Sequence, residues 1–514
     1  MKKEDLFEIM GDLDEKEILN AGGYAPDAAL ASKEASPLRR LFAGRRFVAV
    51  AACAVLVLVS LAGIRILRNG FLGIGTGGNT GPGQEAGGAA GTAELVDASD
   101  GLVTIKAELP EPTAPNMSAS QFLRGDGHYD WWVSYMDSRA ASAELQGGMS
   151  GYYLSIMDRL LTDESQNTVC SPLNIYLAVS TLAEMSDGNT RRQVLDFLGV
   201  SDIRTLRESV ATLWASNYVD TPLLKSLLAS SLWLNGSVPF RQETLSRLAS
   251  TYCTSSFLGD PSSKEMNEAL RSWTDENTGN LLTEYTKDLS LDADTVLSLV
   301  STLYYKAMWE QEFSEDETSQ EIFHGTEGDT SVDMMHRTAI ASVYGTDGFT
   351  ALGLGLSDSG GMYIFLPDEG VSVESLVTNP EILNASSVMF YEDEHISRPI
   401  VHLSLPKFTV SQKADLIETL KALGITDALD ASLADFTPLT EADEPIFVSS
   451  AEHAAMVEID EHGVTGAAYT DLALAGGAAI PEDEMYFTVD RPFLFLITGR
   501  DNSVLFAGII RNIE

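Results

Sequence analysis

The stretch from Glu458 to Phe493 reads EIDEHGVTGAAYTDLALAGGAAIPEDEMYFTVDRPF, and the rest of the chain is interpreted from it. From Gly463 onward its residues are mainly glycine, alanine and other small types, until Pro481 and three acidic residues break the pattern. This composition between two strand-like blocks is typical of an exposed loop. A loop of this length inside a compact domain is uncommon and usually functional.

The same stretch also alternates with a period of two. Thr465, Tyr469 and Asp471 share one parity. The other parity is small or apolar: Val464, Gly466, Ala468, Thr470, Leu472 and Leu474. Alternate side chains of a strand share a face. The residues alone therefore leave two alternatives open, a flexible Gly/Ala linker and a loop that can become a strand with a small inner face.

Composition narrows the class of protein. The chain has 514 residues, a formal net charge of −42 and a pI of about 4.3. Such a surface repels phosphate backbones, which argues against nucleic-acid binding. The three cysteines, Cys53, Cys170 and Cys253, show no spacing typical of a disulfide framework or a zinc site. We therefore expect no metal and no cofactor.

The N-terminal part predicts a membrane anchor. Residues 47–64 (FVAVAACAVLVLVSLAGI) contain no charge and are long enough for a spanning helix. A secretory signal peptide is the rival interpretation of this run. However, the segment before it is too long for the usual n-region of a signal peptide. Arginines before the span outnumber those after it, so residues 1–46 are expected in the cytoplasm. These arginines are Arg39, Arg40, Arg45 and Arg46 before it, and Arg65 and Arg68 after it.

The remaining chain divides by composition. Residues 65–92 form a Gly-rich linker. Residues 93–148 are interpreted as an extension packed on the main domain, which spans 149–514. In that domain helical patterns such as IYLAVSTLAEM come first, and strand patterns such as MYIFLP, VHLSLPKF and VLFAGII dominate later. This mixture predicts an α+β fold.

Residues 149–514 resemble the serpins, a family of serine-protease inhibitors, in the order of their motifs. Glu461-His462-Gly463 resembles the hinge of the serpin reactive-centre loop, and Asp490-Arg491-Pro492-Phe493 resembles its distal end. Further matching blocks are Asn167 to Leu173, Tyr304 to Trp309, Phe365-Leu366-Pro367, Leu405-Pro406-Lys407-Phe408 and Phe506-Ala507-Gly508. Together with residues 47–64, they suggest a bacterial, membrane-anchored member of the family.

The resemblance implies a large central sheet, smaller sheets, about nine helices and an exposed reactive-centre loop. It also implies site residues in two regions. The hinge is Glu461, Gly463, Val464, Thr465, Gly466, Ala467 and Ala468. The shutter and breach, where the sheet opens, are Ser171, Asn174, Ser301, Trp309 and His453. Ser301 replaces the family's asparagine, and Tyr469 is bulkier than usual, but no hinge position with an inward side chain carries a charge or a proline.

A catalytic role is the competing hypothesis. Asp358-Ser359-Gly360-Gly361 resembles the nucleophile loop of trypsin-like enzymes. Such a serine needs a partnered His and Asp, and none of the seven histidines stands in the matching motif. The same residues also read as a turn between strands. We therefore expect that the protein is not an enzyme.

The expected function is inhibition of a serine protease at the cell surface by loop cleavage and sheet insertion. The family's spacing from Gly463 places the reactive bond near Gly477-Ala478, within the bracket Ala475 to Ile480. The small residues there favour elastase-like or subtilisin-like proteases. We expect a monomer whose inhibitor domain is extracellular and attached to the membrane by one helix. The alternative is a non-inhibitory serpin that acts as a surface binding or adhesion protein.

Overall fold

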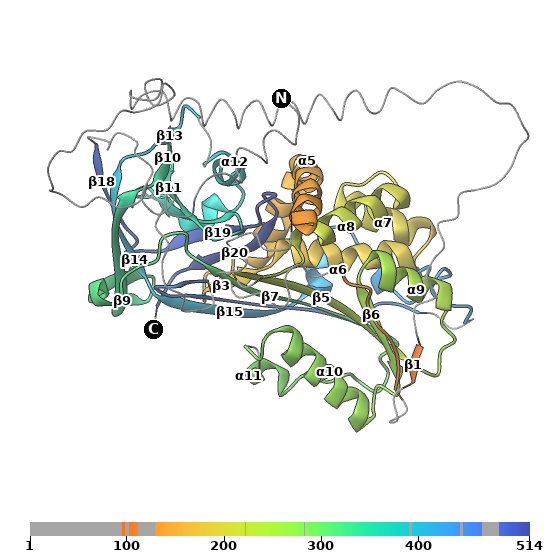
Figure 1. Cartoon of the computed structure of the whole chain (residues 1–514). Coiled ribbons are helices and arrows are strands. Elements are labelled where there is room, and N and C mark those ends of the chain that lie inside the picture. The colour runs from red at the N-terminus through yellow and green to blue at the C-terminus, as the bar shows by residue number, and fades with distance from the viewer. Residues whose placement is uncertain are drawn as a thin grey trace, which may run out of the picture. The chain divides into compact units, whose positions relative to one another are not determined.

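The described part of the chain is built from three sheets with helices packed against them (Figure 1). This computed structural model describes residues 95–97, 102–110, 129–221, 223–281, 283–389, 393–442, 446–464 and 483–513. The predicted span at 47–64, the linker and loop residues 465–482 lie outside these ranges. Within them, no helix combines the length and apolar character needed to cross a membrane.

The largest sheet holds the hinge. Its strands lie in the order β1 (Leu95–Asp97), β2 (Val103–Ile105), β6 (Thr254–Gly259), β5 (Leu224–Asn235), β7 (Leu297–Met308), β17 (Gly463–Val464), β16 (Ser450–Ile459) and β15 (Phe408–Asp415), and β4 (Val219–Asp220) pairs with β5. The inward positions of β16 are buried and the outward ones are half-buried. This alternation is expected for a sheet that covers the core with one face.

Two further sheets complete the fold. The second runs β13 (Ile396–Ser397), β10 (Ser342–Thr346), β11 (Phe349–Gly355), β12 (Gly361–Pro367), β19 (Phe493–Thr498), β20 (Val504–Ile510) and β3 (Thr168–Cys170). The third runs β18 (Glu484–Thr488), β14 (Ile400–Pro406), β9 (Gly328–Ile340) and β8 (Ser319–Gly325). β12, β19 and β20 are buried along their whole length, which explains their continuous apolar sequences.

Helices cover both faces of the large sheet. Figure 1 shows α10 (Lys264–Asn277) and α11 (Thr283–Thr286) on one side. On the other side lie α5 (Tyr129–Leu160), α6 (Pro172–Met185), α7 (Gly188–Leu198), α8 (Ile203–Asn217) and α9 (Gln242–Thr251). The shorter α12 (Glu381–Val388) and α13 (Leu416–Ala422) follow later in the chain. The α+β prediction is confirmed.

The long helix α5 crosses the predicted boundary between residues 148 and 149. Polar contacts fix it to the turn between β19 and β20. Ser142 donates to Asp501 at 2.6 Å, and the Gln146 side chain donates to Ser503 at 3.0 Å. Earlier in the chain, β2 pairs with β6 in the large sheet. The described part of the N-terminal extension is therefore continuous with the domain that follows.

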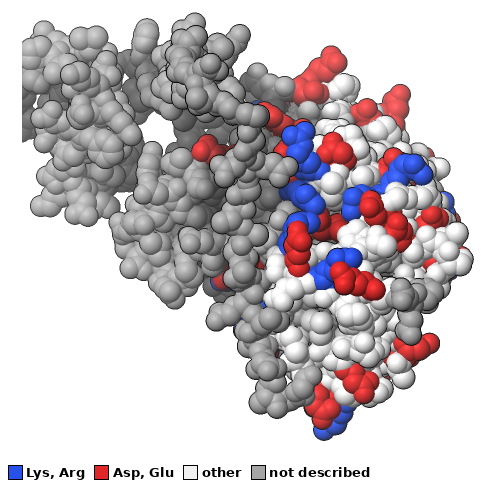
Figure 2. All heavy atoms as spheres, turned by 90° about the vertical axis from the view of Figure 1, so that its right-hand side faces the viewer, with Lys and Arg blue, Asp and Glu red and all other residues white. Residues whose placement is uncertain are grey.

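Charges of both signs are mixed on the face drawn in Figure 2. Beneath the surface, the buried Glu184 on α6 accepts hydrogen bonds from Arg207 on α8 and from Arg247 and Tyr252. Burial alone would raise the pKa of Glu184, but the two arginines outweigh it and lower that pKa. This cluster ties three helices together.

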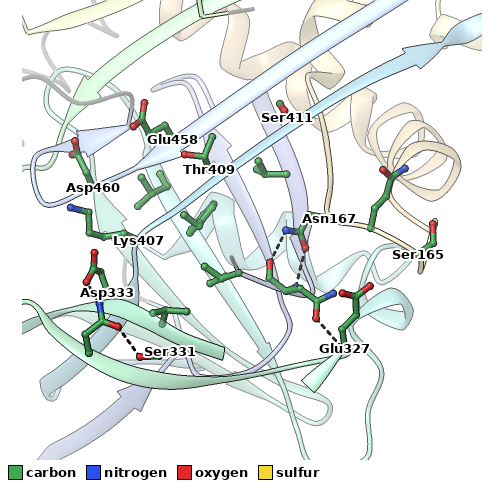
Figure 3. A pocket seen from close by; sticks show the side chains of 18 residues that line it. Ser165, Asn167, Glu327, Ser331, Asp333, Lys407, Thr409, Ser411, Glu458 and Asp460 are labelled. Carbon is green, nitrogen blue, oxygen red and sulfur yellow. Dashed lines mark hydrogen bonds between the residues drawn. The ribbon is translucent and has the colours of Figure 1, made fainter. Parts of the chain in front are cut away.

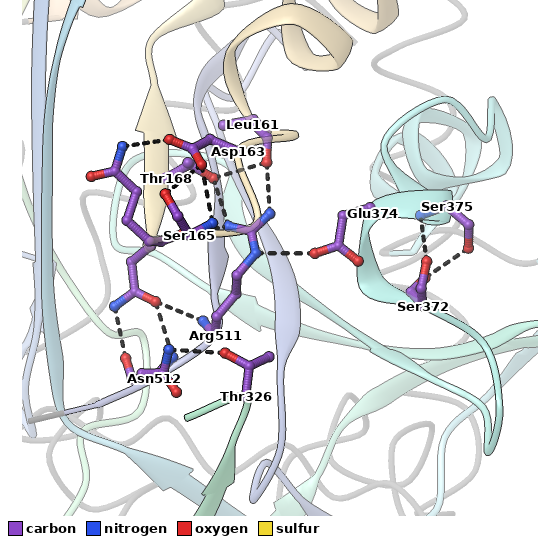
Figure 4. Close-up of polar contacts among 12 residues, drawn as sticks. Leu161, Asp163, Ser165, Thr168, Thr326, Ser372, Glu374, Ser375, Arg511 and Asn512 are labelled. Atoms are coloured by element: carbon purple, nitrogen blue, oxygen red, sulfur yellow. Dashed lines mark hydrogen bonds and ion pairs between the residues drawn. The ribbon is translucent and has the colours of Figure 1, made fainter. Parts of the chain in front are cut away.

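The C-terminal strand is anchored by a fully buried arginine (Figure 4). Arg511 donates to Glu374 at 3.0 Å and to the carbonyl oxygens of Gln166 and Leu161 at 2.6 and 2.9 Å. The neighbouring Asn512 is held through Asn167. Strands β18, β19 and β20 are therefore held by pairing within the two smaller sheets, and β20 also by this anchor.

Candidate functional site: the opening between β7 and β16

A tight turn delivers the first loop residues into the large sheet. The N–H of Asp460 donates to the carbonyl of Gly463 at 3.1 Å. The Asp460 carboxylate accepts the N–H groups of His462 and Gly463 at 2.8 and 3.1 Å. Aspartate commonly stabilises turns by bonding backbone N–H groups just ahead of it. As a result β17 lies between β7 and β16, with Val464 opposite Ala307 and Ile459.

Glycine is required at position 463 for two reasons. Its φ of +155° is a conformation that L side chains rarely adopt. A Cβ atom there would also overlap the carbonyl oxygen of Ala307 and lie 2.9 Å from the Cα of Met308. The close approach of β17 to β7 depends on this residue.

Trp309 lies beneath the turn, directly after β7. It is buried, and its indole N–H donates to the carbonyl of Asp460 at 2.9 Å. Its backbone N–H donates to the carbonyl of His462 at 3.0 Å, and the N–H of Phe313 donates to that of Glu461 at 2.9 Å. The predicted breach tryptophan and the hinge are thus joined by backbone-directed bonds.

Glu461 carries the main electrostatic contact of the turn. The residue is 5% exposed, and its two carboxylate oxygens are 2.9 Å from Lys407 Nζ and 2.8 Å from Thr318 Oγ1. Burial would raise the pKa of Glu461, but the donors Lys407 and Thr318 prevail and lower it. Removing Lys407 would leave the buried Glu461 carboxylate without its charged partner, which is destabilising.

Below β17 the large sheet is parted. β7 and β16 pair directly only where Ser298–Ser301 lies beside Ser450–His453. Above that, β7 residues 302–306 and β16 residues 454–458 have no pairing with each other among the described residues. Since strand edges present free N–H and C=O groups, the opening can accept one more strand.

The lower end of the opening contains a buried histidine. His453 is 1% exposed, and its Nε2 accepts the backbone N–H of Ser171 at 3.0 Å. Because Nε2 accepts, the neutral ring carries its proton on Nδ1. Burial lowers the pKa of His453 to about 4, so the ring is neutral at physiological pH.

Several donors next to His453 have no partner among the described residues. They are His453 Nδ1, Ser171 Oγ and Asn174 Nδ2, all buried. Buried polar atoms are normally paired. Such groups can bond a segment that enters the lower end of the opening.

A polar hollow of about 980 Å³ lies beside the turn at Asp460 (Figure 3). It follows the outer strand β15. Lys407, Asp460 and Asp333 lie close together at one end, and Asn167 and Glu327 at the other. The side chains that line it are largely polar, unlike the apolar pockets that hold most small ligands.

Comparison with known proteins decides the family. A family description, "Serpin (serine protease inhibitor)", matches residues 152–513. The chain belongs to the serpin family. It is 30% identical to Serpin-ZX of Arabidopsis thaliana, over 73% of this chain and 98% of that protein.

Solved serpin structures agree with this fold. The native stressed conformation of Arabidopsis AtSerpin1 has 26% identity, covers 73% of this chain and 98% of its own, and gives a TM-score of 0.62. The thermophilic serpin tengpin in its native state has 21% identity, covers 71% and 93%, and gives a TM-score of 0.63. The predicted serpin fold is confirmed.

The structure brings seven of the predicted site residues of this serpin to one seam of the large sheet. Glu461, Gly463, Val464 and Trp309 lie at its upper end, and Ser301 faces His453 at its lower end, next to Ser171. The other predicted hinge and reactive-bond residues lie outside the described residues: Thr465, Gly466, Ala467, Ala468, Gly477 and Ala478.

Three residues of the seam were not predicted as site residues. Lys407 stood in a recognised block, but its pairing with Glu461 joins distant parts of the chain. Thr318 carries no local signal. Asp460 had one, since an aspartate shortly before a glycine often forms a turn.

The serine of the protease-like motif lies in a turn of this serpin. Ser359 is buried in the turn between β11 and β12. Among the described residues its hydroxyl lies 2.8 Å from that of Tyr305 and 3.5 Å from the carbonyl of Thr498. Neither neighbour is a histidine that could take its proton.

Proposed function

We propose that this serpin inhibits serine proteases as a suicide substrate whose cleaved loop becomes a strand of the large sheet. The supporting observation is β17, which already lies between β7 and β16 above a parted sheet. A segment that follows Val464 in the same register would fill the opening. The solved AtSerpin1 relative is described as stressed, which is the state that such an insertion would relieve.

The register predicts where each loop residue would go. Val464 lies opposite Ala307 and Ile459. Six residues further along, Thr470 would lie between Ser301 and His453, beside the unpaired donors. Ten residues along, Leu474 would lie opposite Leu297, the first residue of β7. The inserted strand would thus span 463–474.

The length of the inserted strand, residues 463–474, agrees with the proposed position of the cut. The protease serine attacks the carbonyl of the reactive bond and forms an acyl-enzyme, and the new amine terminus leaves. The bracket Ala475 to Ile480 lies just beyond Leu474, so the cut would release a strand of the right length. Insertion carries the acylated protease away and ester hydrolysis is blocked. The small residues Gly477 and Ala478 suit elastase-like or subtilisin-like pockets.

We further propose a location at the outer surface of a bacterial cell, attached through residues 47–64. The support is the uncharged run and the arginines that precede it. Surface proteolysis of intact cells tests this: residues beyond 70 should be cut and those before 46 spared.

One observation favours the non-inhibitory alternative. In the inserted register Tyr469 would lie opposite Thr302 and Ala454. Between these residues and α10–α11 the structure leaves a cavity of only about 30 Å³, too small for a phenol ring. Insertion therefore requires α10 or α11 to move. If the energy barrier to that movement is too high, the protease would cleave this serpin without being trapped.

Incubation with a panel of serine proteases, followed by denaturing gels, tests the proposal. A covalent complex should form with an elastase or a subtilisin. Val464 is 1% exposed, so Val464→Arg would place an unpaired charge in the core. That variant should be cleaved without forming complex. Cleavage of the wild type without complex, for every protease in the panel, would overturn the inhibitory proposal.

A further inference from the structure

The outer face of the four-stranded sheet is a regular grid of exposed and half-buried side chains. Its positions come from three paired strands: His336, Thr338 and Ile340 on β9, Ile400, His402 and Ser404 on β14, and Glu484, Tyr486 and Thr488 on β18. The intervening residues of β14, Val401, Leu403 and Leu405, are buried. This grid is called the outer face below.

Tyr486 is the most exposed large apolar side chain of the described residues, at 76%. Its ring stacks on His402 with centroids 4.5 Å apart and an angle of 19°. His402 is held in turn by Glu484 at 3.3 Å and by Thr338 at 3.1 Å. A tyrosine held rigidly while exposed loses little conformational entropy on binding, and tyrosine is enriched among residues that dominate interfaces.

The outer face is mainly polar, with an exposed aromatic ring and a carboxylate at one edge. Ile340 is 48% exposed in the row next to Tyr486. Glu484 lies in that same row, and the nine grid positions include no lysine or arginine. A flat aromatic surface beside a carboxylate favours an arginine or lysine of the partner through cation–π and ion-pair contacts.

The position of β18 identifies the partner. β18 begins at Glu484, just after loop residues 465–482. From Ala478 to Tyr486 the chain has eight residues, about 28 Å when fully extended. A protease of ~250 residues is roughly 45 Å across. The outer face therefore lies within reach of a protease whose cleft holds the reactive bond.

We propose that the outer face is a second contact surface for the target protease, with Tyr486 as its anchor and Glu484 facing a basic side chain at the rim of the cleft. This inference rests on the proposed function only for the identity of the partner. In this proposal the outer face determines how fast the protease binds and cleaves the loop. The loop and the large sheet determine whether the protease is then trapped.

The test uses the full-length chain with pancreatic elastase and with subtilisin. Tyr486→Ala should lower the second-order rate of loop cleavage about tenfold with at least one of them. Tyr486→Phe, which keeps the stacked ring, should stay near wild type. Leu433→Ala is the matched control, because Leu433 is 57% exposed on a turn beside α7, far from β18. Unchanged rates for Tyr486→Ala with both proteases would overturn the proposal.

Charge gives an independent measurement. Glu484→Gln should slow cleavage at low salt and flatten its salt dependence, because steering by opposite charges acts on the association rate. Faster cleavage in this variant would contradict a basic partner. The fraction of product that ends as covalent complex reports on the inhibitory mechanism instead. If proteases cleave the wild type but never form a covalent complex with it, the inhibitory mechanism is wrong. Slower cleavage of Tyr486→Ala would still support the outer face as a contact surface for the protease.

Discussion

At Gly463 the backbone of β17 approaches β7 so closely that a single methyl group would overlap it. Gly463→Ala should therefore lower the free energy of unfolding by about 1–3 kcal/mol and displace β17 from the sheet. Urea unfolding measures the change. Gly345→Ala is the control, since that glycine has no atom within 4 Å of the added Cβ and an ordinary φ. Equal midpoints for the two variants would show that β17 is not held as described.

His453 makes stability depend on pH in a defined window. Its pKa is lowered by burial to about 4 in the folded state, against about 6.5 in an unfolded chain. Between these values the unfolded chain binds a proton that the folded one does not. Stability is therefore complete above about pH 6.5 and is lost as pH falls toward 4.

The expected loss from this residue between pH 7.5 and pH 5 is about 2 kcal/mol. Urea unfolding of wild type and His453→Gln at both pH values isolates it, because glutamine can still accept the Ser171 N–H but does not titrate. The wild type should lose more stability than the variant on acidification. The same loss in both would assign the pH dependence to other groups.

At the scale of elements, α10 and α11 control access to the opening. The cavity beneath them is about 30 Å³, and the proposed register places Tyr469 there. Tyr469→Ala should ease insertion and raise the fraction of cleaved molecules that end as covalent complex. Tyr469→Phe, which keeps the ring, is the control. Quantitative denaturing gels measure this fraction. A lower fraction of covalent complex for Tyr469→Ala would show that Tyr469 is not what limits loop insertion.

The sequence predicted which segments form helices and strands better than it predicted where these begin and which distant residues they contact. Alternating and apolar blocks marked β12, β14, β19 and β20, because burial on one or both faces leaves a local pattern. The start of α5 at Tyr129 was missed, since Gly147, Gly148 and Gly151 normally weaken a helix. Contacts with Asp501 and Ser503 hold it instead. Such contacts between distant segments leave no trace in a local pattern.

At the candidate site too, features with a local sequence pattern were predicted and contacts between distant residues were not. The parity of Val464 and the proximity of His453 to Ser171 followed from pattern and resemblance. The pair of Lys407 with Glu461 did not, because an ion pair joins residues of no fixed spacing. Nor could the sequence reveal that the sheet is parted below β17. That property depends on how far the pairing of β7 and β16 extends.

For the whole molecule, the proposed insertion implies that the uncleaved folded state is not the most stable arrangement of the chain. A loop that becomes a central strand gains ladder hydrogen bonds on two sides and buries its small apolar face. The uncleaved state would then persist because the barrier to rearrangement is high. The turn at Glu461 and the neutral His453 are the contacts that hold it.

Thermal unfolding before and after a single cut within residues 475–480 tests this account most directly. About ten newly paired residues, with hydrogen bonds of ~0.5–1.5 kcal/mol each, should raise the unfolding temperature of the cleaved molecule by roughly 10 °C or more. The C-terminal fragment should remain bound until denaturation. An unfolding temperature that stays the same or falls after the cut would contradict insertion, and with it the proposed inhibitory mechanism.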